Sequence, residues 1–158
     1  MQQQFKDMPL YVGTLYSNAK QMTRAAYNEF RGWKLPANEQ GDDMGYLVIN
    51  HQGQNNTTHC TGYVSWVPKD LFESTHLLVG DVTDLPPFHQ RIKAERTQLI
   101  DRIQKLVAFI GMDSFLDLDA FEQSRLNSQL DYMQSYRREL DERLIALSEA
   151  DKEKATAA

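Results

Sequence analysis

The chain changes its pattern at Pro86-Pro87, and this change constrains the fold more than any other feature. Before the two prolines, short stretches of β-forming residues alternate with turns rich in Gly, Asn and aromatic residues. After them, residues 88–147 hold a single glycine, Gly111, and no proline or tryptophan, and apolar residues recur at helical spacing. Because strands and helices have different periods, this pattern predicts two separately built units.

Composition excludes several classes of protein. The chain has 158 residues and a formal charge of −5. Neither half is basic, which argues against direct nucleic-acid binding, because that needs clustered Lys and Arg. The single cysteine, Cys60, excludes an internal disulfide and fits a reducing cytosol. With no apolar run long enough to span a membrane and no signal peptide at Met1, we expect a cytoplasmic protein without membrane contact.

Residues 1–82 predict a small α+β module with short helices and about three or four antiparallel strands. Thr23 is expected to cap a helix over 24–30, and Gly32 is suited to the left-handed position after its end. Pro68 is expected to begin a second short helix, where its missing amide costs nothing. The expected strands are 10–16, 45–50 and 62–66, with 76–82 as a further strand that closes the sheet.

A linker over residues 83–88 is expected to lead into an antiparallel α-helical hairpin over 89–148. Gly111 ends the first helix, and Asp119-Ala-Phe-Glu122 has the form of a capping box that starts the second. Residues 149–158 have no apolar stripe and are predicted to be a disordered tail. The expected fold class is therefore α+β, a small N-terminal sheet followed by a long helical hairpin.

The hairpin also predicts self-association. Its apolar stripe is narrow, and Arg96 occupies one position of the seam. A lone pair of helices has little core and is marginal in water. We therefore expect a homo-oligomer, most simply a dimer that forms a four-helix bundle. The interface residues predicted from the stripe are Leu126, Leu130, Met133 and Leu140.

No arrangement of residues in the sequence indicates an enzyme. None of the four histidines has a second ligand at a spacing that zinc sites use. Ser65 lacks the glycine-flanked turn of a hydrolase nucleophile, and no Gly-rich phosphate loop occurs. The carboxylate pair Asp42-Asp43 is explained by a turn, and the pair Asp117/Asp119 by helix capping. We expect no catalysis, no metal and no cofactor.

Aromatic and basic residues crowd the first module. Planar rings beside Arg suit a site for a nucleobase or for a protein partner, although a small core needs the same large residues. Arg31 can fork onto a phosphate or carboxylate, and the helix after Thr23 is expected to present free amides to an anion. The candidate ligand-binding residues are Arg31, Trp33, Lys34, Tyr27 and Tyr63.

Two stretches resemble bacteriophage families. A module of small tailed-phage proteins, often found before a Thoeris anti-defence domain, is similar over about residues 10–75. The matching runs include Tyr11-Val-Gly-Thr14, Met22-Thr-Arg-Ala-Ala-Tyr27-Asn28, Arg31-Gly32-Trp33, Leu35-Pro36-Ala37-Asn38-Glu39, Gly45-Tyr46-Leu47-Val48 and Gly62-Tyr63-Val64-Ser65-Trp66. The second half, from Leu85-Pro-Pro-Phe-His-Gln-Arg91 to Arg143, resembles a phage helical-hairpin family of unknown function.

The first resemblance implies a phage counter-defence protein in the host cytoplasm. Thoeris anti-defence domains are sponges that sequester a nucleotide immune signal. The motif of the sponge domain itself is absent from this chain, so sequestration is not carried over residue by residue. The resemblance implies a binding protein for a nucleotide signal. The alternative is a protein that binds and inhibits a host defence or nucleic-acid enzyme through protein–protein contacts.

Overall fold

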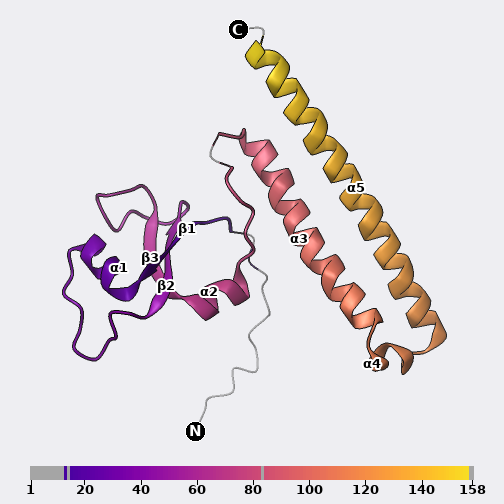
Figure 1. Cartoon of the computed structure of the whole chain (residues 1–158), viewed down its shortest axis with the longest axis horizontal. Helices are drawn as coiled ribbons and strands as arrows, with labels where there is room; N and C mark the ends of the chain where they lie inside the picture. The colour runs from indigo at the N-terminus through magenta and orange to yellow at the C-terminus, as the bar shows by residue number, and fades with distance from the viewer. Residues whose placement is uncertain (1–12, 14, 83, 157–158) are drawn as a thin grey trace. The chain divides into compact units, whose positions relative to one another are not determined.

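The computed structural model describes residue 13, residues 15–82 and residues 84–156, with the side chains of 151–156 excepted. The described chain divides into two compact units, Met1–His76 and Leu77–Ala158. The first holds a three-stranded antiparallel sheet with two short helices, and the second holds two long antiparallel helices (Figure 1). The predicted α+β class, a small sheet followed by a helical hairpin, is confirmed. We call these parts the sheet unit and the hairpin unit.

The sheet has the order β1-β2-β3, with β1 at Asn18–Thr23, β2 at Met44–Asn50 and β3 at Tyr63–Pro68. Helix α1 spans Arg24–Arg31, and α2 spans Lys69–Thr75. The core joins Tyr27 of α1 to Leu47 and Val64 of the sheet. On the other face, the ring of Tyr46 stacks on Phe72 of α2 at 4.2 Å. Because neighbouring residues of a strand point to opposite faces, α1 and α2 cover opposite faces of the sheet.

Both ends of α1 follow the sequence prediction. Thr23 caps the helix, and its hydroxyl accepts a hydrogen bond from the Ala26 amide at 3.2 Å. Gly32 has φ 66° and ψ 25°, a left-handed conformation that glycine adopts without strain. Its amide donates to Asn28 and Glu29 carbonyls, which closes the C-terminus.

Two strand predictions differ from the structure. Within the expected strand 10–16, Leu10–Val12 and Thr14 lie outside the described residues, while Leu15 and Tyr16 are not in a strand. The first strand is instead β1, whose polar sequence Asn-Ala-Lys-Gln-Met-Thr has no apolar alternation. Residues 76–82 form no strand, so they do not close the sheet. β1 is a strand because its backbone pairs with β2. This contact is long-range, so the local alternation of apolar and polar residues does not reveal it.

In the hairpin unit, α3 runs from Pro87 to Ile110 and α5 from Ala120 to Thr156, joined by the short helix α4 at Asp113–Leu116 (Figure 1). Asp119 caps α5 by accepting hydrogen bonds from the amides of Phe121 and Glu122. The linker predicted over 83–88 ends earlier, because Pro87 already belongs to α3. The tail predicted to be disordered from 149 is helical as far as Thr156.

The hairpin core is narrow. Its buried residues are Ile92 and Leu99 of α3 and Leu140 of α5, which is completely buried. Two polar contacts cross between the helices and fix their register, one from Arg96 to Asp141 and one from Tyr136 to Glu95. The hydrogen bond to Glu95 raises the pKa of the Tyr136 hydroxyl. Among the helices that the structure describes, none is long and apolar enough to cross a membrane.

Candidate functional site

The aromatic and basic residues predicted as a site do gather around α1. Tyr27 and Arg31 lie one helical turn apart, and Trp33 follows directly after the Gly32 turn. The Arg31 guanidinium lies over the Trp33 ring, 4.3 Å from its centroid. Tyr27 meets the same ring edge-on at 6.3 Å. Three of the five predicted ligand-binding residues therefore form one cluster.

Hydrogen bonds within the sheet unit already engage the Arg31 guanidinium. Nη2 donates to the Asn56 carbonyl at 2.9 Å, and Nη1 donates to the Val64 carbonyl at 3.3 Å and lies 3.5 Å from the Tyr27 hydroxyl. The Asn56 side chain also pairs with Val64, accepting from its amide and donating to its carbonyl, each at 2.8 Å. Arg31 and Asn56 thus anchor the loop after β2 to the outer edge of β3.

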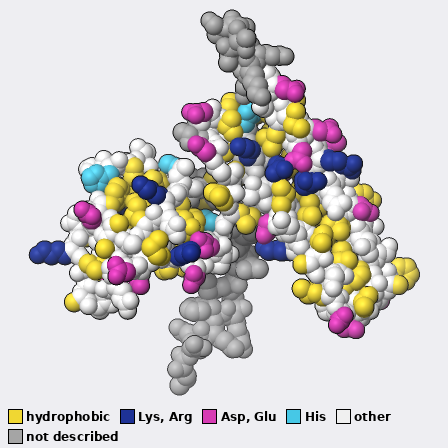
Figure 2. Space-filling view, viewed as in Figure 1, with side chains coloured by type: hydrophobic (Ala, Val, Ile, Leu, Met, Phe, Trp, Pro, Cys, Tyr) yellow, Lys and Arg dark blue, Asp and Glu magenta, His cyan; other side chains and the backbone are white. Residues whose placement is uncertain are grey.

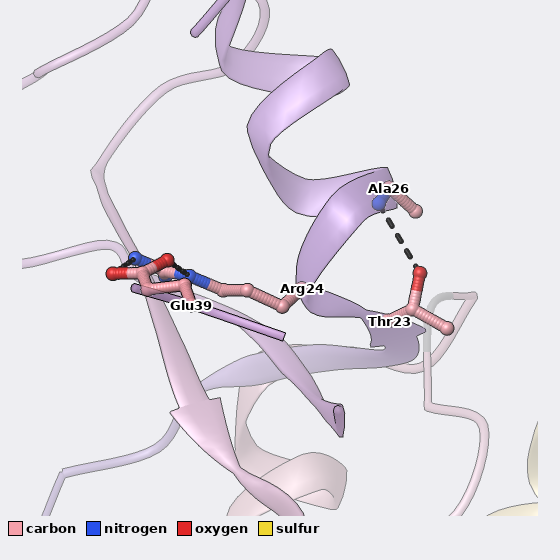
Figure 3. Close-up of polar contacts among 4 residues, drawn as sticks. All are labelled: Thr23, Arg24, Ala26 and Glu39. Carbon is pink, nitrogen blue, oxygen red and sulfur yellow. Dashed lines mark hydrogen bonds and ion pairs between the residues drawn. The ribbon is translucent and has the colours of Figure 1, made fainter. Parts of the chain in front are cut away.

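The expected anion site at the start of α1 is absent, because its amides have partners. Arg24 N donates to the Asp43 carbonyl at 2.8 Å, and Ala25 N donates to the Gly41 carbonyl at 2.9 Å. Ala26 N donates to the Thr23 hydroxyl (Figure 3). A loop that returns over the first turn therefore takes the donors that would otherwise attract an anion. The sequence prediction of free amides here was wrong.

A second arginine holds that loop in place. Arg24 makes a two-pronged pair with Glu39, Nε to Oε2 at 2.5 Å and Nη2 to Oε1 at 2.9 Å (Figure 3). These hydrogen bonds lower the pKa of the Glu39 carboxyl and raise that of Arg24. The same guanidinium lies 5.0 Å from the centroid of Trp66 and 5.7 Å from that of Tyr27. Arg24 and Trp66 therefore contribute to the packing of the sheet unit. The sequence alone did not decide whether the aromatic and basic residues form a core or a site.

Tyr63 lies on the opposite face of the sheet from this cluster, because its strand neighbour Val64 packs against Tyr27. What remains accessible among the predicted residues is aromatic. Trp33 is 53% exposed and Tyr63 is 48% exposed, whereas Tyr27 is buried in the core. Lys34 is exposed next to Trp33. Two aromatic rings and a lysine are therefore exposed at the surface. Arg31, which was predicted to bind an anion, instead donates hydrogen bonds to backbone carbonyls of the same unit.

The hairpin unit carries a groove that the sequence did not single out. It has a volume of ≈ 500 Å³ and lies between the N-terminal half of α3 and the C-terminal half of α5. Lys93 and Arg96 supply positive charge on its α3 side, and Ile145, which is 59% exposed, supplies apolar surface on α5. The lining residues are Val79, Lys93, Arg96, Thr97, Asp141, Leu144 and Ile145.

The positive groups of the groove differ in how they are held. Arg96 pairs through Nε with one oxygen of Asp141, and Arg137 reaches the other oxygen at 3.5 Å. Lys93 has neither an ion pair nor a hydrogen bond from its ammonium to any side chain that the structure describes. One carboxylate thus holds two guanidinium groups, and the lysine is left for another anion. On the face drawn in Figure 2, basic side chains form a band across the hairpin, with acidic side chains among them.

The sequence contained one sign of this groove. Arg96 stands where the seven-residue apolar pattern of α3 calls for an apolar residue, and a charged residue at a seam position needs a partner. The partner, Asp141, lies 45 positions away, so local spacing did not reveal it. Lys93 and Thr97 can be recognised as neighbours of Arg96 in the groove only when the register of α3 against α5 is known.

The four residues predicted as an oligomer interface are largely used within one chain. Leu140 is completely buried, and Met133 packs against the same core. Leu126 and Leu130 are half-buried on α5. In the described part of the chain, no group of three or more His, Cys, Asp or Glu side chains could hold a metal ion.

Comparison with known proteins finds a similarity that lies in the hairpin unit. A family model described as Sequestin matches residues 86–146, which comprise α3, α4 and most of α5. The matched range holds every lining residue of the groove except Val79. Among curated proteins and solved structures, none matches the chain. The hairpin unit is therefore similar to this family over most of its length.

Proposed function

We propose that this chain is a phage counter-defence protein that sequesters a nucleotide immune signal in the host cytoplasm, without transforming it chemically. The observation that carries the proposal is the coincidence of the Sequestin match with the basic groove of the hairpin. The resemblance of residues 10–75 to a module that often precedes nucleotide sponges supports the same reading.

The groove combines the two kinds of surface that a nucleotide needs. Lys93 and the free end of Arg96 can bind phosphate oxygens, since charge-assisted hydrogen bonds to phosphate are among the strongest that side chains make. Leu144 and Ile145 offer apolar surface to a base or ribose. Thr97 already donates its hydroxyl to the Lys93 carbonyl, which leaves the hydroxyl oxygen as an acceptor.

The surface of the sheet unit is a second place for the same ligand. Trp33 keeps an open face on which a base could stack, and the adjacent Lys34 could bind a phosphate, whereas Tyr63 lies on the opposite face of the sheet. Arg31 and Tyr27 belong to this predicted site but are held in the fold by hydrogen bonds and burial. We therefore favour the hairpin groove.

Titration calorimetry of the full chain tests the proposal. The probes are cyclic dinucleotides, cyclic ADP-ribose isomers and nicotinamide nucleotides. Lys93→Ala should weaken binding of the active probe at least about tenfold, the equivalent of one charge-assisted contact. Lys105→Ala is the matched control, because Lys105 lies on the same helix and pairs with Asp101 outside the groove. Absence of heat with every probe would refute nucleotide sequestration.

A second function, inhibition of a host protein, is favoured by exposed aromatic side chains on α5. Phe121 is 80% exposed and Tyr132 is 76% exposed. Aromatic residues are enriched where proteins bind one another. Native mass spectrometry of the chain purified from infected cells separates the two readings. A retained small mass supports the sponge, and a retained host protein supports the inhibitor.

A further inference from the structure

One flank of the hairpin has an uncharged middle. Lys93 and Thr97 of α3 and Asp141 and Ile145 of α5 line the same groove, so these positions share a flank. Helical periodicity continues that flank along both helices at steps of three or four residues. On α5 the continuation first passes Arg137, which pairs with Asp141. Beyond it, the continuation consists of Ile100, Gln104 and Val107 on α3 and Asn127, Leu130 and Gln134 on α5. We call these six residues the strip.

The strip is open to solvent and contains apolar surface. Val107 is 48% exposed, and Ile100 and Leu130 are half-buried. Gln104 and Gln134 are exposed amides without charge. Depletion of charge at a patch centre is the compositional mark of a protein interface. Figure 2 shows apolar side chains on the hairpin beyond the basic band, on the side toward α4.

Opposite charges lie beyond the two ends of the strip. Lys93, Arg96 and Arg137 stand toward one end, where Asp141 pairs with both arginines. Asp113 and Asp117 stand at the other end, where α4 turns the chain, and both are exposed. Along the chain, Lys93 precedes Gln104 by eleven residues and Asp113 follows it by nine. The first separation is about 16 Å at 1.5 Å per residue, and Asp113 lies just beyond Ile110, the last residue of α3.

We propose that a second copy of the chain docks on the strip in antiparallel orientation about a two-fold axis near Gln104. In such an interface each contact occurs twice. In this arrangement the two strips pack against each other, and the basic end of each copy lies beside the acidic α4 end of the other. Charge complementarity therefore selects a second copy, because an unrelated acidic or basic partner would match only one end.

The size of this flank suits a reversible dimer. Twenty residues of helix are about 30 Å long, and two packed helices are about 20 Å wide. The flank thus offers about 600 Å² per copy, at the lower limit for specific interfaces. The surface shares only Leu130 with the interface predicted from sequence, because Met133 and Leu140 of that interface pack within one chain. The proposal does not depend on the nucleotide.

Light scattering after size exclusion of the full chain, without added nucleotide, tests it. We expect a dimer at low ionic strength that dissociates as salt rises, because the end contacts are screened. Val107→Asp places a charge at the strip and should raise the dimer dissociation constant at least about tenfold. Tyr132→Asp is the matched control, since Tyr132 is exposed on α5 and lies in a different hollow, with Arg125 and Ser128.

A charge exchange distinguishes docking from loss of folding. Lys93→Glu and Asp113→Lys should each weaken the dimer, and the double variant should recover it. Circular dichroism shows whether each variant keeps its helices. A monomer for the unmodified chain at every concentration and ionic strength would overturn the proposal. A dimer that Tyr132→Asp dissociates and Val107→Asp leaves intact would overturn it equally.

Discussion

The sheet unit and the hairpin unit differ in how the basic side chains of their candidate sites are held. In the sheet unit, Arg24 donates two hydrogen bonds to the Glu39 carboxylate, and Arg31 donates to the carbonyls of Asn56 and Val64. In the hairpin unit, Asp141 gathers two arginines while Lys93 is left without a partner among the described residues. The two arginines of α1 are therefore engaged within their own unit, whereas the accessible Lys93 lies in the hairpin groove.

The difference follows from how each unit forms a core. A three-stranded sheet with two short helices has little apolar area, so its aromatic rings and the stems of its arginines supply the burial. A helical hairpin buries one narrow stripe and leaves the flanks of both helices open. An aromatic and basic composition in a small sheet thus indicates packing first, while a charged residue inside a helical stripe indicates a site.

The largest expected effect separates the two units by stability. Leu140→Ala leaves a cavity at a fully buried position of the hairpin and should cost about 2–5 kcal/mol. Both tryptophans lie in the sheet unit, so their fluorescence follows that unit alone. We expect helical circular dichroism to be lost at lower temperature while the fluorescence transition stays in place. Ile145→Ala, at an exposed position of the same helix, is the control. A common shift of both transitions would show that the units unfold together.

Arg31→Ala examines the other side of the comparison. It removes two charge-assisted hydrogen bonds that anchor the loop after β2, which should destabilise the sheet unit by about 2–3 kcal/mol. The tryptophan fluorescence transition should move and the hairpin transition should not. Lys34→Ala should change stability by less than about 0.5 kcal/mol, as is usual for exposed residues. An unchanged melting temperature with loss of nucleotide binding would instead make Arg31 a ligand residue.

A smaller effect is expected at the cap of α1. Thr23→Ala removes the acceptor of the Ala26 amide and should destabilise the sheet unit by about 1 kcal/mol. Thr23→Ser keeps the hydroxyl and should behave almost like the unmodified chain. Fluorescence-detected urea unfolding measures both. If serine and alanine destabilise equally, the methyl group rather than the hydrogen bond matters at this position.

Local patterns predicted much of the fold. The Thr23 cap, the Gly32 terminus, and the positions of β2, β3 and both long helices all follow from residues within a turn of one another. The patterns failed at β1, where a polar stretch becomes a strand because β2 supplies its hydrogen bonds. They also missed α4, a single turn in the connection that the sequence treated as a simple loop.

The candidate site was harder to predict because its contacts are long-range. The sequence placed Tyr27, Arg31 and Trp33 together correctly, since they are close along α1. It could not show that the loop containing Asn56 would engage Arg31, or that Gly41 and Asp43 would cover the first turn. Predicting the hairpin groove would have required the register of α3 against α5, which brings Arg96 to Asp141.

The smallest expected effect is a dependence on pH confined to the sheet unit. Arg24 hydrogen-bonds to Glu39 and lowers the pKa of that carboxyl below its ordinary value of 4.5. Because the folded state binds this proton less readily than the unfolded chain, the contact contributes stability above the ordinary pKa. That contribution is lost as the pH falls through the lowered, folded pKa. Glu39→Gln should therefore flatten the acid side of the stability curve followed by tryptophan fluorescence, with little change in the hairpin transition. Glu29→Gln, at an exposed carboxylate of α1, is the control. If the stability of Glu39→Gln still falls at acid pH as steeply as that of the unmodified chain, the Arg24–Glu39 pair does not set the acid sensitivity of the sheet unit.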